Sequence, residues 1–299
     1  MDINHKKKFD IIIPCFNVDN IIEKSLDSIF SQEYSNDKFS VIAIDDGSTD
    51  NTLKSLNNYK SEKNFTLINF KSNKGLSKAR NEGIRSGNSE IICFIDSDMV
   101  IQPNWLLNVE KILMKKGVIG TIGKTVLPKG QTPNKLDNYF YSKYRGVRQF
   151  GSDSIIGPTW FLFNNSAVKR SAIEKTDLFD ENIRQYGGED TDLAIRLWDR
   201  FPNSFYYSSQ IIAEHHHKRT LEQFCSQLEI YGKHNLPMLL KKHPKYYKAL
   251  GGDWTNSIKG WLVFNMVIAG MLEHNCSSIN YWRSQAFRMA LAKNNCYKN

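Results

Sequence analysis

Short apolar runs alternate with amphipathic segments over the first hundred residues. Four runs have the composition of strands buried on both faces, and they span 9–15, 39–44, 65–70 and 91–95. Helices are expected between them, at 22–30, 52–59 and 76–85. Asn20 and Glu23 have the spacing of a capping box for the first helix. Alternating strands and helices predict right-handed crossovers and a parallel sheet, and therefore an α/β fold.

Acidic residues follow two of these strands at the point where each strand ends. Asp45 and Asp46 follow the second strand, and Asp96 and Asp98 follow the fourth. Ligands of open α/β sheets bind beyond the carboxyl ends of the strands. Asp96 and Asp98 are two residues apart, so on an extended chain both carboxylates can face one hard cation. The alternative is a plain turn rich in Asp and Ser.

The pattern changes after residue 103. We expect helices at 105–115 and 166–175, strands at 118–126, 155–163 and 211–214, and a functional or mobile loop without periodicity at 128–151. Asp190 precedes an amphipathic helix at 193–198, and its plainest interpretation is an N-cap. His215, His216 and His217 follow the last strand, which places His215 and His217 on one face if the strand continues. Helices, including 221–231 and 261–272, are expected from there on.

Composition narrows the class of protein. The chain has 299 residues, of which 40% are hydrophobic and 24% charged, as in ordinary folded proteins. Five scattered cysteines without CxxC spacing suggest neither a disulfide framework nor a zinc site. The beginning of the chain is polar and basic, unlike a signal peptide, and the apolar stretch 261–272 is too short to span a bilayer, so a cytoplasmic location is expected.

The net charge of +9 favours acidic partners such as phosphates or an anionic membrane surface, although dispersed surface lysines explain it as well. No nucleic-acid-binding motif is present, so nucleic acid is not an expected partner. The first strand is followed by no GxGxxG, and the chain has no Gly-Lys-Ser/Thr loop. A dinucleotide-binding Rossmann domain and a P-loop NTPase are therefore disfavoured. Acidic loops suit a diphosphate bridged by a metal ion better.

Five motifs in series resemble the inverting nucleotide-sugar glycosyltransferases of family 2. They are FDIIIPCFN (9–17), VIAIDDGSTDNT (41–52), NKGLSKARNEGI (73–84), EIICFIDSDMV (90–100) and GGEDTDLAIRL (187–197). The resemblance covers about residues 9–220. It implies a GT-A fold, which is a Rossmann-like, mostly parallel sheet flanked by helices. The nucleotide-binding half would span about 1–100, the acceptor half 101–220, and a helical extension packed on this domain would span 221–299.

The resemblance also implies a role for each motif residue. Pro14 and Asn17 would line the base pocket, and Asp46, with Asp45, would bind the uracil. Residues beside the rest of the nucleotide would be Lys74, Lys78, Arg80, Asp96 and Ser97, among which Arg80 is our choice for direct contact. Asp98 would coordinate Mn²⁺ or Mg²⁺, with His215 first and His217 second as the completing histidine, and Asp96 near the metal. Asp190 would be the general base, and Glu189 would orient the acceptor or the sugar.

The implied activity is metal-dependent, inverting transfer of a hexose or N-acetylhexosamine from a UDP-sugar to a hydroxyl acceptor, such as a glycan, a lipid-linked sugar or a peptide. The Gly-Glu-Asp-x-Asp-Leu motif resembles glycosaminoglycan polymerase and polypeptide GalNAc-transferase domains, which suggests an amino-sugar donor. A departure from the family is Thr176–Asp180, where relatives carry Gly-Gly-Phe-Asp. The alternatives are a retaining transferase and a non-catalytic sugar-nucleotide-binding protein. Basic carboxy-terminal helices would either contact the inner membrane face peripherally or simply complete the fold.

Overall fold

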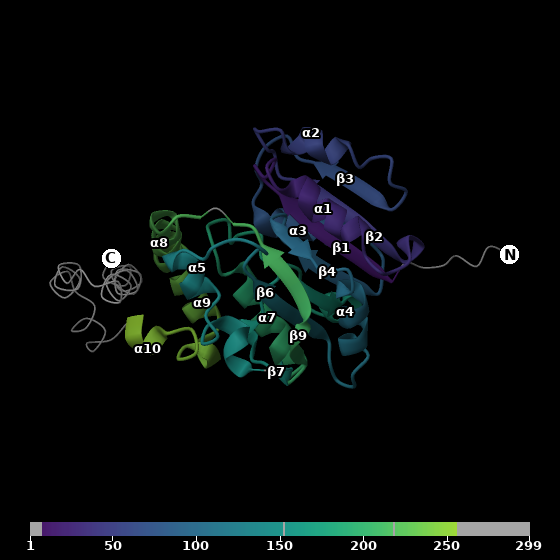
Figure 1. Ribbon diagram of the computed structural model, residues 1–299. Coiled ribbons are helices and arrows are strands. Elements are labelled where there is room, and N and C mark those ends of the chain that lie inside the picture. Colours follow the sequence, from purple (N-terminus) through teal and green to yellow (C-terminus); the bar gives the residue numbers. More distant parts are fainter. Residues whose placement is uncertain (1–7, 152, 218, 256–299) are drawn as a thin grey trace. The chain divides into compact units, whose positions relative to one another are not determined.

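The computed structural model describes residues 8–151, 153–217 and 219–255 (Figure 1). These residues form two compact units. The first holds the described residues up to Arg184 together with Asp190–His217, and the second holds Gln185–Glu189 and the described residues after His217. The expected boundary at residue 220 stays a prediction.

The first unit is built on one mixed sheet. Its strands, in chain order, are β1 (Phe9–Cys15), β2 (Phe39–Asp45), β3 (Phe65–Asn69), β4 (Ile91–Ile95), β5 (Met99–Ile101), β6 (Gly120–Val126), β7 (Ser154–Ile155), β8 (Asn165–Lys169) and β9 (Phe205–His215). Their spatial order is β3-β2-β1-β4-β8-β6-β9-β5, and β7 pairs with β9. The pairings give β1, β2, β3, β4, β6 and β9 one direction and the other three strands the opposite one. The expected α/β class with a mostly parallel sheet is confirmed.

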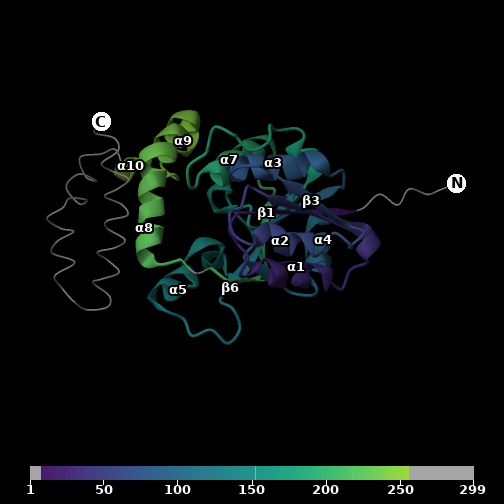
Figure 2. The ribbon, with the colours of Figure 1, turned by 90° about the horizontal axis from the view of Figure 1, so that it is seen from above.

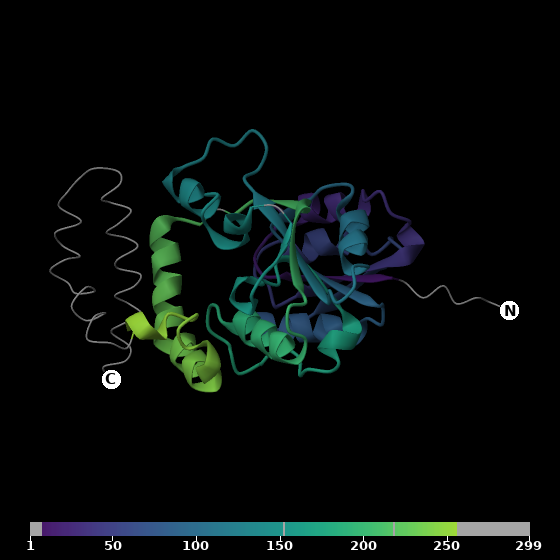
Figure 3. The ribbon, with the colours of Figure 1, turned by 90° about the horizontal axis from the view of Figure 1, so that it is seen from below.

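Helices cover both faces of this sheet (Figures 2 and 3). On one side lie α1 (Ile22–Phe30), α2 (Thr52–Asn57) and α4 (Trp105–Leu113), and on the other lie α3 (Leu76–Ser86) and α7 (Glu189–Arg200). The short α6 (Arg170–Ile173) contributes Ala172 and Ile173 to the core on the α3 side. Successive residues of a strand point to opposite faces. Thus Ile11 and Ile13 of β1 enter the core beneath α1, whereas Ile12 enters the core beneath α3. This explains why the first strands are apolar at most positions.

Several local expectations were wrong. The segment expected as a helix at 166–175 is mostly β8, with only α6 helical, and the strand expected at 155–163 is the short β7 followed by a 3-10 turn at Pro158–Trp160. The segment 128–151 contains α5 (Lys135–Phe140) and a 3-10 helix at Gly146–Phe150. Asn20 does not cap α1. Ile21 is the N-cap residue, and the carbonyl of Val18 accepts the N–H groups of Ile21 and Ile22.

In the second unit the described residues from Leu221 onward are mostly helical. The unit contains α8 (Leu221–Ile230), a π-helical turn (Tyr231–Asn235), α9 (Leu236–Lys242), a 3-10 turn (Pro244–Tyr246) and α10 (Gly252–Thr255). The first unit also has a 3-10 turn, Asn36–Lys38, which directly precedes β2. The helix expected at 261–272 lies outside the described residues. A search of the described helices finds none with the length and apolar character that crossing a membrane requires.

Candidate functional site

The topology brings the acidic motifs to one edge of the sheet. Asp45 ends β2, Asp96 and Asp98 follow β4, and His215 ends β9. These three strands run in the same direction, so their carboxyl ends share an edge. The short β5, which the sequence did not predict, pairs Met99 with His215. This pairing draws the end of β9 to the residues that follow β4.

Asp98 and His215 face each other across that pairing. The Nε2 atom of His215 lies 3.2 Å from Oδ2 of Asp98, and the two side chains are 23% and 29% exposed. The main chain joins the same loops, because the N–H of His216 donates to the carbonyl of Asp98. Tyr141 of the 128–151 segment donates its hydroxyl to the carbonyl of His215 at 3.1 Å. A carboxylate and an imidazole are therefore held together at the edge of the sheet, partly open to solvent.

This pair has the donor chemistry of a Mn²⁺ site, because carboxylates suit Mg²⁺ and Mn²⁺ and an imidazole favours the latter. Within the described part of the chain, no three His, Cys, Asp or Glu side chains are arranged to hold an ion. Asp98 and His215 together offer two protein ligands, one oxygen and one nitrogen. Magnesium in particular commonly receives the rest of its ligands from substrate phosphates and water.

His217 has a different environment from His215. Its Nε2 atom lies 3.5 Å from Oδ1 of the buried Asp137, and its side chain is 8% exposed. The imidazole packs against the rings of Phe140 and Tyr141, at centroid distances of 5.2 and 6.2 Å. Asp137 also completes a capping box with Asn134 at the start of α5. His217 thus packs the 128–151 segment against the end of β9.

A second cluster joins the fourth-strand acids to the start of α7. The buried guanidinium of Arg80 donates from Nη1 to Oδ1 of Asp190 at 2.7 Å and from Nη2 to Oδ1 of Asp96 at 3.3 Å. Burial raises the pKa of Asp96 to about 6; the Arg80 guanidinium opposes the rise, and the carboxylates of Asp98 and Asp190 add to it. Three motifs that are distant in sequence therefore form one charged network.

The structure contradicts the N-cap alternative for Asp190. Helix α7 begins at Glu189, which is itself buried, so Asp190 lies within the first turn. Its carboxylate accepts from groups outside that helix, namely Arg80 at Oδ1 and the backbone N–H of Phe163 at Oδ2, at 3.1 Å. No sequence signal identified Phe163, because its contribution is a main-chain group.

Hydrogen bonds join the three loops that are expected to bind the nucleotide, which follow β1, β2 and β3. Asn17 lies just beyond β1 with φ of 53°, and its side-chain oxygen accepts the N–H of Thr49 at 2.8 Å. Asp46 is 4% exposed, and its two oxygens accept the N–H groups of Lys74 at 2.6 Å and Gly75 at 2.9 Å. Burial is the main cause that raises the pKa of Asp46, and these two hydrogen bonds oppose it.

The remaining predicted residues lie in the same loops. Asp45 is buried and accepts the N–H of Ser48, whereas the Lys74 side chain is exposed. Ser97 is buried between the two acids of its motif. Pro14 stands in β1 beyond Ile12, where pairing with β4 stops, so its missing N–H leaves no gap in that ladder. Nucleotide contact by these residues stays a prediction.

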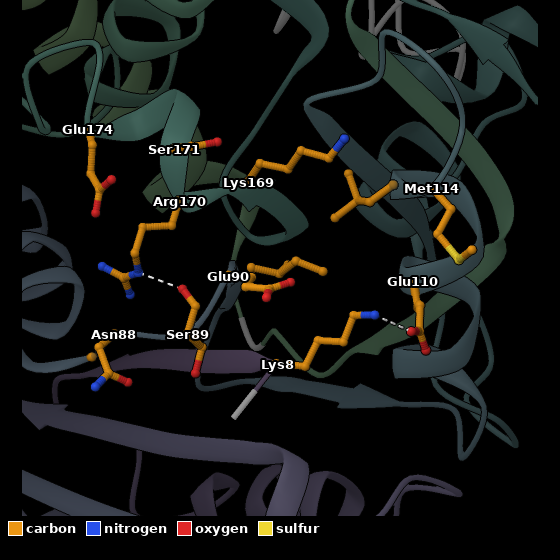
Figure 4. A pocket seen from close by; sticks show the side chains of 13 residues that line it. Lys8, Asn88, Ser89, Glu90, Glu110, Met114, Lys169, Arg170, Ser171 and Glu174 are labelled. Atoms are coloured by element: carbon orange, nitrogen blue, oxygen red, sulfur yellow. Dashed lines mark hydrogen bonds and ion pairs between the residues drawn. The ribbon is translucent and has the colours of Figure 1, made fainter. Parts of the chain in front are cut away.

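A cavity of about 640 Å³ lies at the opposite edge of the sheet (Figure 4). Its walls include Lys8 before β1, Ile91 at the start of β4 and Lys169 at the end of the antiparallel β8. These are the amino ends of the parallel strands, away from the motif loops. Its lining charges are of both signs and partly paired, as in the Lys8–Glu110 and Arg170–Asp10 ion pairs. The cavity therefore does not mark the same site as the motifs.

Comparison with known proteins identifies the class. The sequence model described as Glycosyl transferase family 2 matches residues 10–172, and the chain belongs to this family. Among related proteins, the uncharacterized glycosyltransferase YfnE of Bacillus subtilis (strain 168) is 29% identical over 240 residues, which is 64% of this chain and 60% of that protein. Poly-beta-1,6-N-acetyl-D-glucosamine synthase of Staphylococcus epidermidis is 27% identical over 180 residues, which is 58% of this chain and 43% of the synthase. The chain thus matches less than two thirds of either protein.

Solved structures confirm the expected GT-A fold. The mannosyltransferase PcManGT from Pyrobaculum calidifontis, in complex with GDP-Man and Mn²⁺, has a TM-score of 0.68 at 19% identity, covering 99% of this chain and 89% of that one. Residues 1–349 of S. aureus TarS, in complex with UDP, have a TM-score of 0.58 at 16% identity, covering 97% and 91%. At such identities the likeness concerns the fold.

Proposed function

We propose that this chain is an inverting, metal-dependent glycosyltransferase that moves a hexose or N-acetylhexosamine from a UDP-sugar to a hydroxyl acceptor. The observation that carries the proposal is the meeting of Asp98–His215 and Asp96–Arg80–Asp190 at the carboxyl edge of one sheet. Family membership supports the reaction class, and the nucleotide or nucleotide sugar bound by each of the two structural neighbours supports the type of donor. The N-acetylglucosamine polymer named for the staphylococcal relative favours an amino-sugar donor.

Asp98 and His215 are the proposed protein ligands of the metal, and Asp96, two residues before Asp98, is proposed to act near the ribose. A bound Mn²⁺ or Mg²⁺ would supply Lewis-acid neutralisation of the leaving diphosphate. His215 takes this role in preference to His217, because its Nε2 faces Asp98 whereas that of His217 is near Asp137. Pro14, Asn17, Asp45, Asp46, Lys74 and Ser97 are proposed to shape the nucleotide pocket through the loops that they build.

Asp190 is the proposed general base. Arg80 and the N–H of Phe163 hold one oxygen each of its carboxylate. The carboxylate would take the proton of the acceptor hydroxyl while that oxygen bonds to the anomeric carbon of the donor. The bond from the anomeric carbon to the β-phosphate oxygen breaks on the opposite side, and UDP leaves with the bonding electrons. Glu189 is proposed to orient the acceptor or the sugar.

Two substitutions separate the metal role from the base role. Asp190→Asn should lower kcat by about 10²–10⁴-fold, which is the usual contribution of a positioned general base, and leave metal-dependent UDP binding intact. Asp98→Ala should abolish metal-dependent UDP binding, measured by titration calorimetry with Mn²⁺ and with EDTA. Glu174→Gln, at the cavity on the opposite edge, is the matched carboxylate control and should retain both. Full activity of Asp190→Asn would sink the assignment of the base.

Donor and acceptor are found by screening. A thermal-shift panel of UDP- and GDP-sugars with Mn²⁺ selects the donor, and glycan, lipid-linked and peptide acceptors are then tested with it. The anomeric configuration of the product, determined from NMR coupling constants, must be opposite to that of the donor. Retained configuration would replace the proposal with a retaining mechanism. Nucleotide-sugar binding without transfer or hydrolysis would indicate a binding protein.

A further inference from the structure

Arg80 is a buried cation shared by two carboxylates. It lies on the inner face of α3 and is only 1% exposed. One side of its guanidinium bonds Asp190 and the other bonds Asp96, and the group lies 5.3 Å from the ring centre of Phe179. The family motif implies that this arginine contacts the nucleotide. In this chain the protein itself surrounds the guanidinium, so a nucleotide has little of its surface to reach.

A closed ring of hydrogen bonds fixes the candidate base through this arginine. Nη1 of Arg80 donates to Oδ1 of Asp190 at 2.7 Å, the N–H of Phe163 donates to Oδ2 of Asp190 at 3.1 Å, and Nη2 of Arg80 donates to the carbonyl of Phe163 at 2.8 Å. A carboxylate held at both oxygens by donors on a rigid frame has few orientations left. The planar fork of arginine makes such a frame, and a lysine ammonium does not.

The same guanidinium links the base to the donor side of the site. Asp96, its second partner, directly follows β4, and the N–H of Asp96 donates to the carbonyl of Asn164, the residue after Phe163. Phe179 belongs to the segment in which this chain departs from the family pattern, and it packs on Phe163 and Phe94 at centroid distances of 5.0 and 5.7 Å. The departure therefore forms part of the packing around the guanidinium.

We propose that Arg80 is a positioning residue that sets the distance and orientation between Asp190, which takes the acceptor proton, and Asp96, which lies on the donor side. The inference rests on the proposed function, because it assigns Arg80 a task within that reaction. Arg80 would thus act on turnover through Asp190 and would contribute little to nucleotide affinity. Substitution of a residue that binds nucleotide would instead weaken nucleotide affinity and change turnover little.

The test compares Arg80→Lys and Arg80→Gln with Arg85→Gln, a substitution on the same helix. Arg85 is an exposed arginine that pairs with Glu181, so it controls for loss of a cation from α3. Calorimetry measures the Kd of UDP with Mn²⁺, and steady-state kinetics give kcat and the donor KM. We expect kcat of both Arg80 variants to fall by about 10²-fold, as for a misplaced catalytic group. The Kd of UDP and the donor KM should change less than about threefold. A threefold change corresponds to less than half of the roughly 1.4 kcal/mol that a tenfold change represents.

A double-variant cycle adds a result that simple loss of stability would not produce. If Arg80 acts through Asp190, adding Arg80→Lys to Asp190→Asn should lower kcat no further, because the base is already absent. In thermal unfolding, Arg80→Gln leaves two carboxylates without their shared cation and should lower Tm, and adding Asp190→Asn should recover part of that loss. These comparisons remain informative even if Arg80→Gln alone folds poorly.

Failure of the inference can be told apart from failure of the proposed function. If the wild-type chain and Arg85→Gln transfer sugar but Arg80→Lys keeps full kcat, the positioning role is overturned and the transferase assignment stands. A Kd for UDP weakened tenfold or more with kcat unchanged would return Arg80 to the nucleotide site. If the wild-type chain transfers no sugar to any acceptor, the proposed function itself fails.

Discussion

The carboxylate of Asp46 shows how one buried acid organises a loop. Its oxygens accept the N–H groups of two successive residues, Lys74 and Gly75, which begin the turn into α3. Asp46 itself is buried and the two hydrogen bonds are partly buried, so Asp46→Ala would leave both N–H groups without their charged acceptor. We expect the free energy of unfolding to fall by about 1–3 kcal/mol, the usual cost of leaving a buried polar group unsatisfied. Urea denaturation measures this change.

Asp37→Ala is the control for Asp46, because Asp37 is an exposed carboxylate that accepts from the Ser35 hydroxyl nearby in the chain and lies 3.9 Å from Lys38, so the substitution removes local surface contacts. Exposed ion pairs usually contribute about 0–1 kcal/mol. If the two substitutions cost the same, the hydrogen bonds to the 74–75 turn do not stabilise the fold. If Asp46→Ala loses more stability than Asp37→Ala and also binds UDP more weakly, the 74–75 turn contributes to the nucleotide pocket.

At the scale of single residues, the sequence identified the acids of the site but not their partners. Asp96, Asp98 and Asp190 stood out because they follow strands or precede a helix. Arg80 was expected to face ligand, yet it meets acids 16 and 110 residues away in the chain. Such a meeting depends on three elements packing together, and local pattern contains no information about it. The contribution of the Phe163 backbone was invisible for the same reason.

At the scale of elements, Gly47 lies where the loop after β2 passes close to the loop after β3. It has φ of +73°, and a Cβ added there would lie 2.5–2.6 Å from backbone atoms of Ser72 and Asn73. Gly47→Ala would therefore combine the strain of a positive φ with a collision that only movement of the 72–73 backbone can relieve. We expect a loss of stability beyond the roughly 1 kcal/mol of φ strain alone, measured as a shift in Tm.

Gly117 provides the matched control for Gly47. Its φ is +81°, and a Cβ there would meet nothing within 4 Å. Gly117→Ala should therefore show the φ strain without the collision, and its Tm should fall less than that of Gly47→Ala. Equal decreases in Tm for the two variants would mean that the backbone at 72–73 moves away from the added Cβ at little cost. In that case the close approach does not constrain the nucleotide side of the sheet.

Asp50 ties the loop after β1 to the start of α2. Its oxygens accept the N–H groups of Thr52 at 2.9 Å and Asp19 at 3.2 Å. Partial burial alone would raise the pKa of Asp50, but hydrogen bonds, first those from Thr52, outweigh it and hold the pKa below its ordinary value of 3.8. A lowered native pKa means that the unfolded chain binds the proton more tightly. The resulting stability is present above pH 3.8 and is lost as the pH falls through the native pKa.

We therefore expect the Tm of Asp50→Asn to fall less than that of the wild type between about pH 5 and about pH 3, because asparagine has no proton to gain over that range. At neutral pH the variant should be somewhat less stable than the wild type. If Tm falls with pH equally in Asp50→Asn and in the wild type, the hydrogen bonds to the Asp50 carboxylate do not contribute the predicted pH-dependent stability.

The elements that the sequence predicted correctly are those whose pattern is decided locally. The strands β1, β2 and β4 are predominantly apolar runs, and the central turns of α3 follow helical spacing. The strand β8 was mistaken for a helix because the residues Ser166, Ala167 and Val168 suit either structure. It is a strand because it fits antiparallel between β4 and β6, which is a tertiary constraint. The three-residue β5 was too short to leave a pattern.

At the scale of the whole first unit, a buried ion pair joins the beginning of the sheet to its later half. Asp10 of β1 accepts hydrogen bonds from the N–H and hydroxyl of Ser89, both at 2.8 Å, and from Nη2 of Arg170, at 2.7 Å. Arg170 also donates to the carbonyl of Ser89, as Figure 4 shows, and to the carbonyl of Ile84. One guanidinium thus bridges β1, the end of α3 and the start of α6, at the edge of the sheet opposite the motif loops.

Arg170→Ala should lower the free energy of unfolding by about 3–5 kcal/mol, because it leaves the carboxylate of Asp10 buried without its cation. Lys169→Ala, next in the chain and lining the same cavity, should cost no more than about 0.5 kcal/mol. Below its lowered Tm, the Arg170 variant should keep the kcat of the wild type, since the motif loops occupy the other edge. A small stability loss would mean that water replaces the guanidinium at Asp10. A fall in kcat without a change in folding would mean that the two edges of the sheet are coupled.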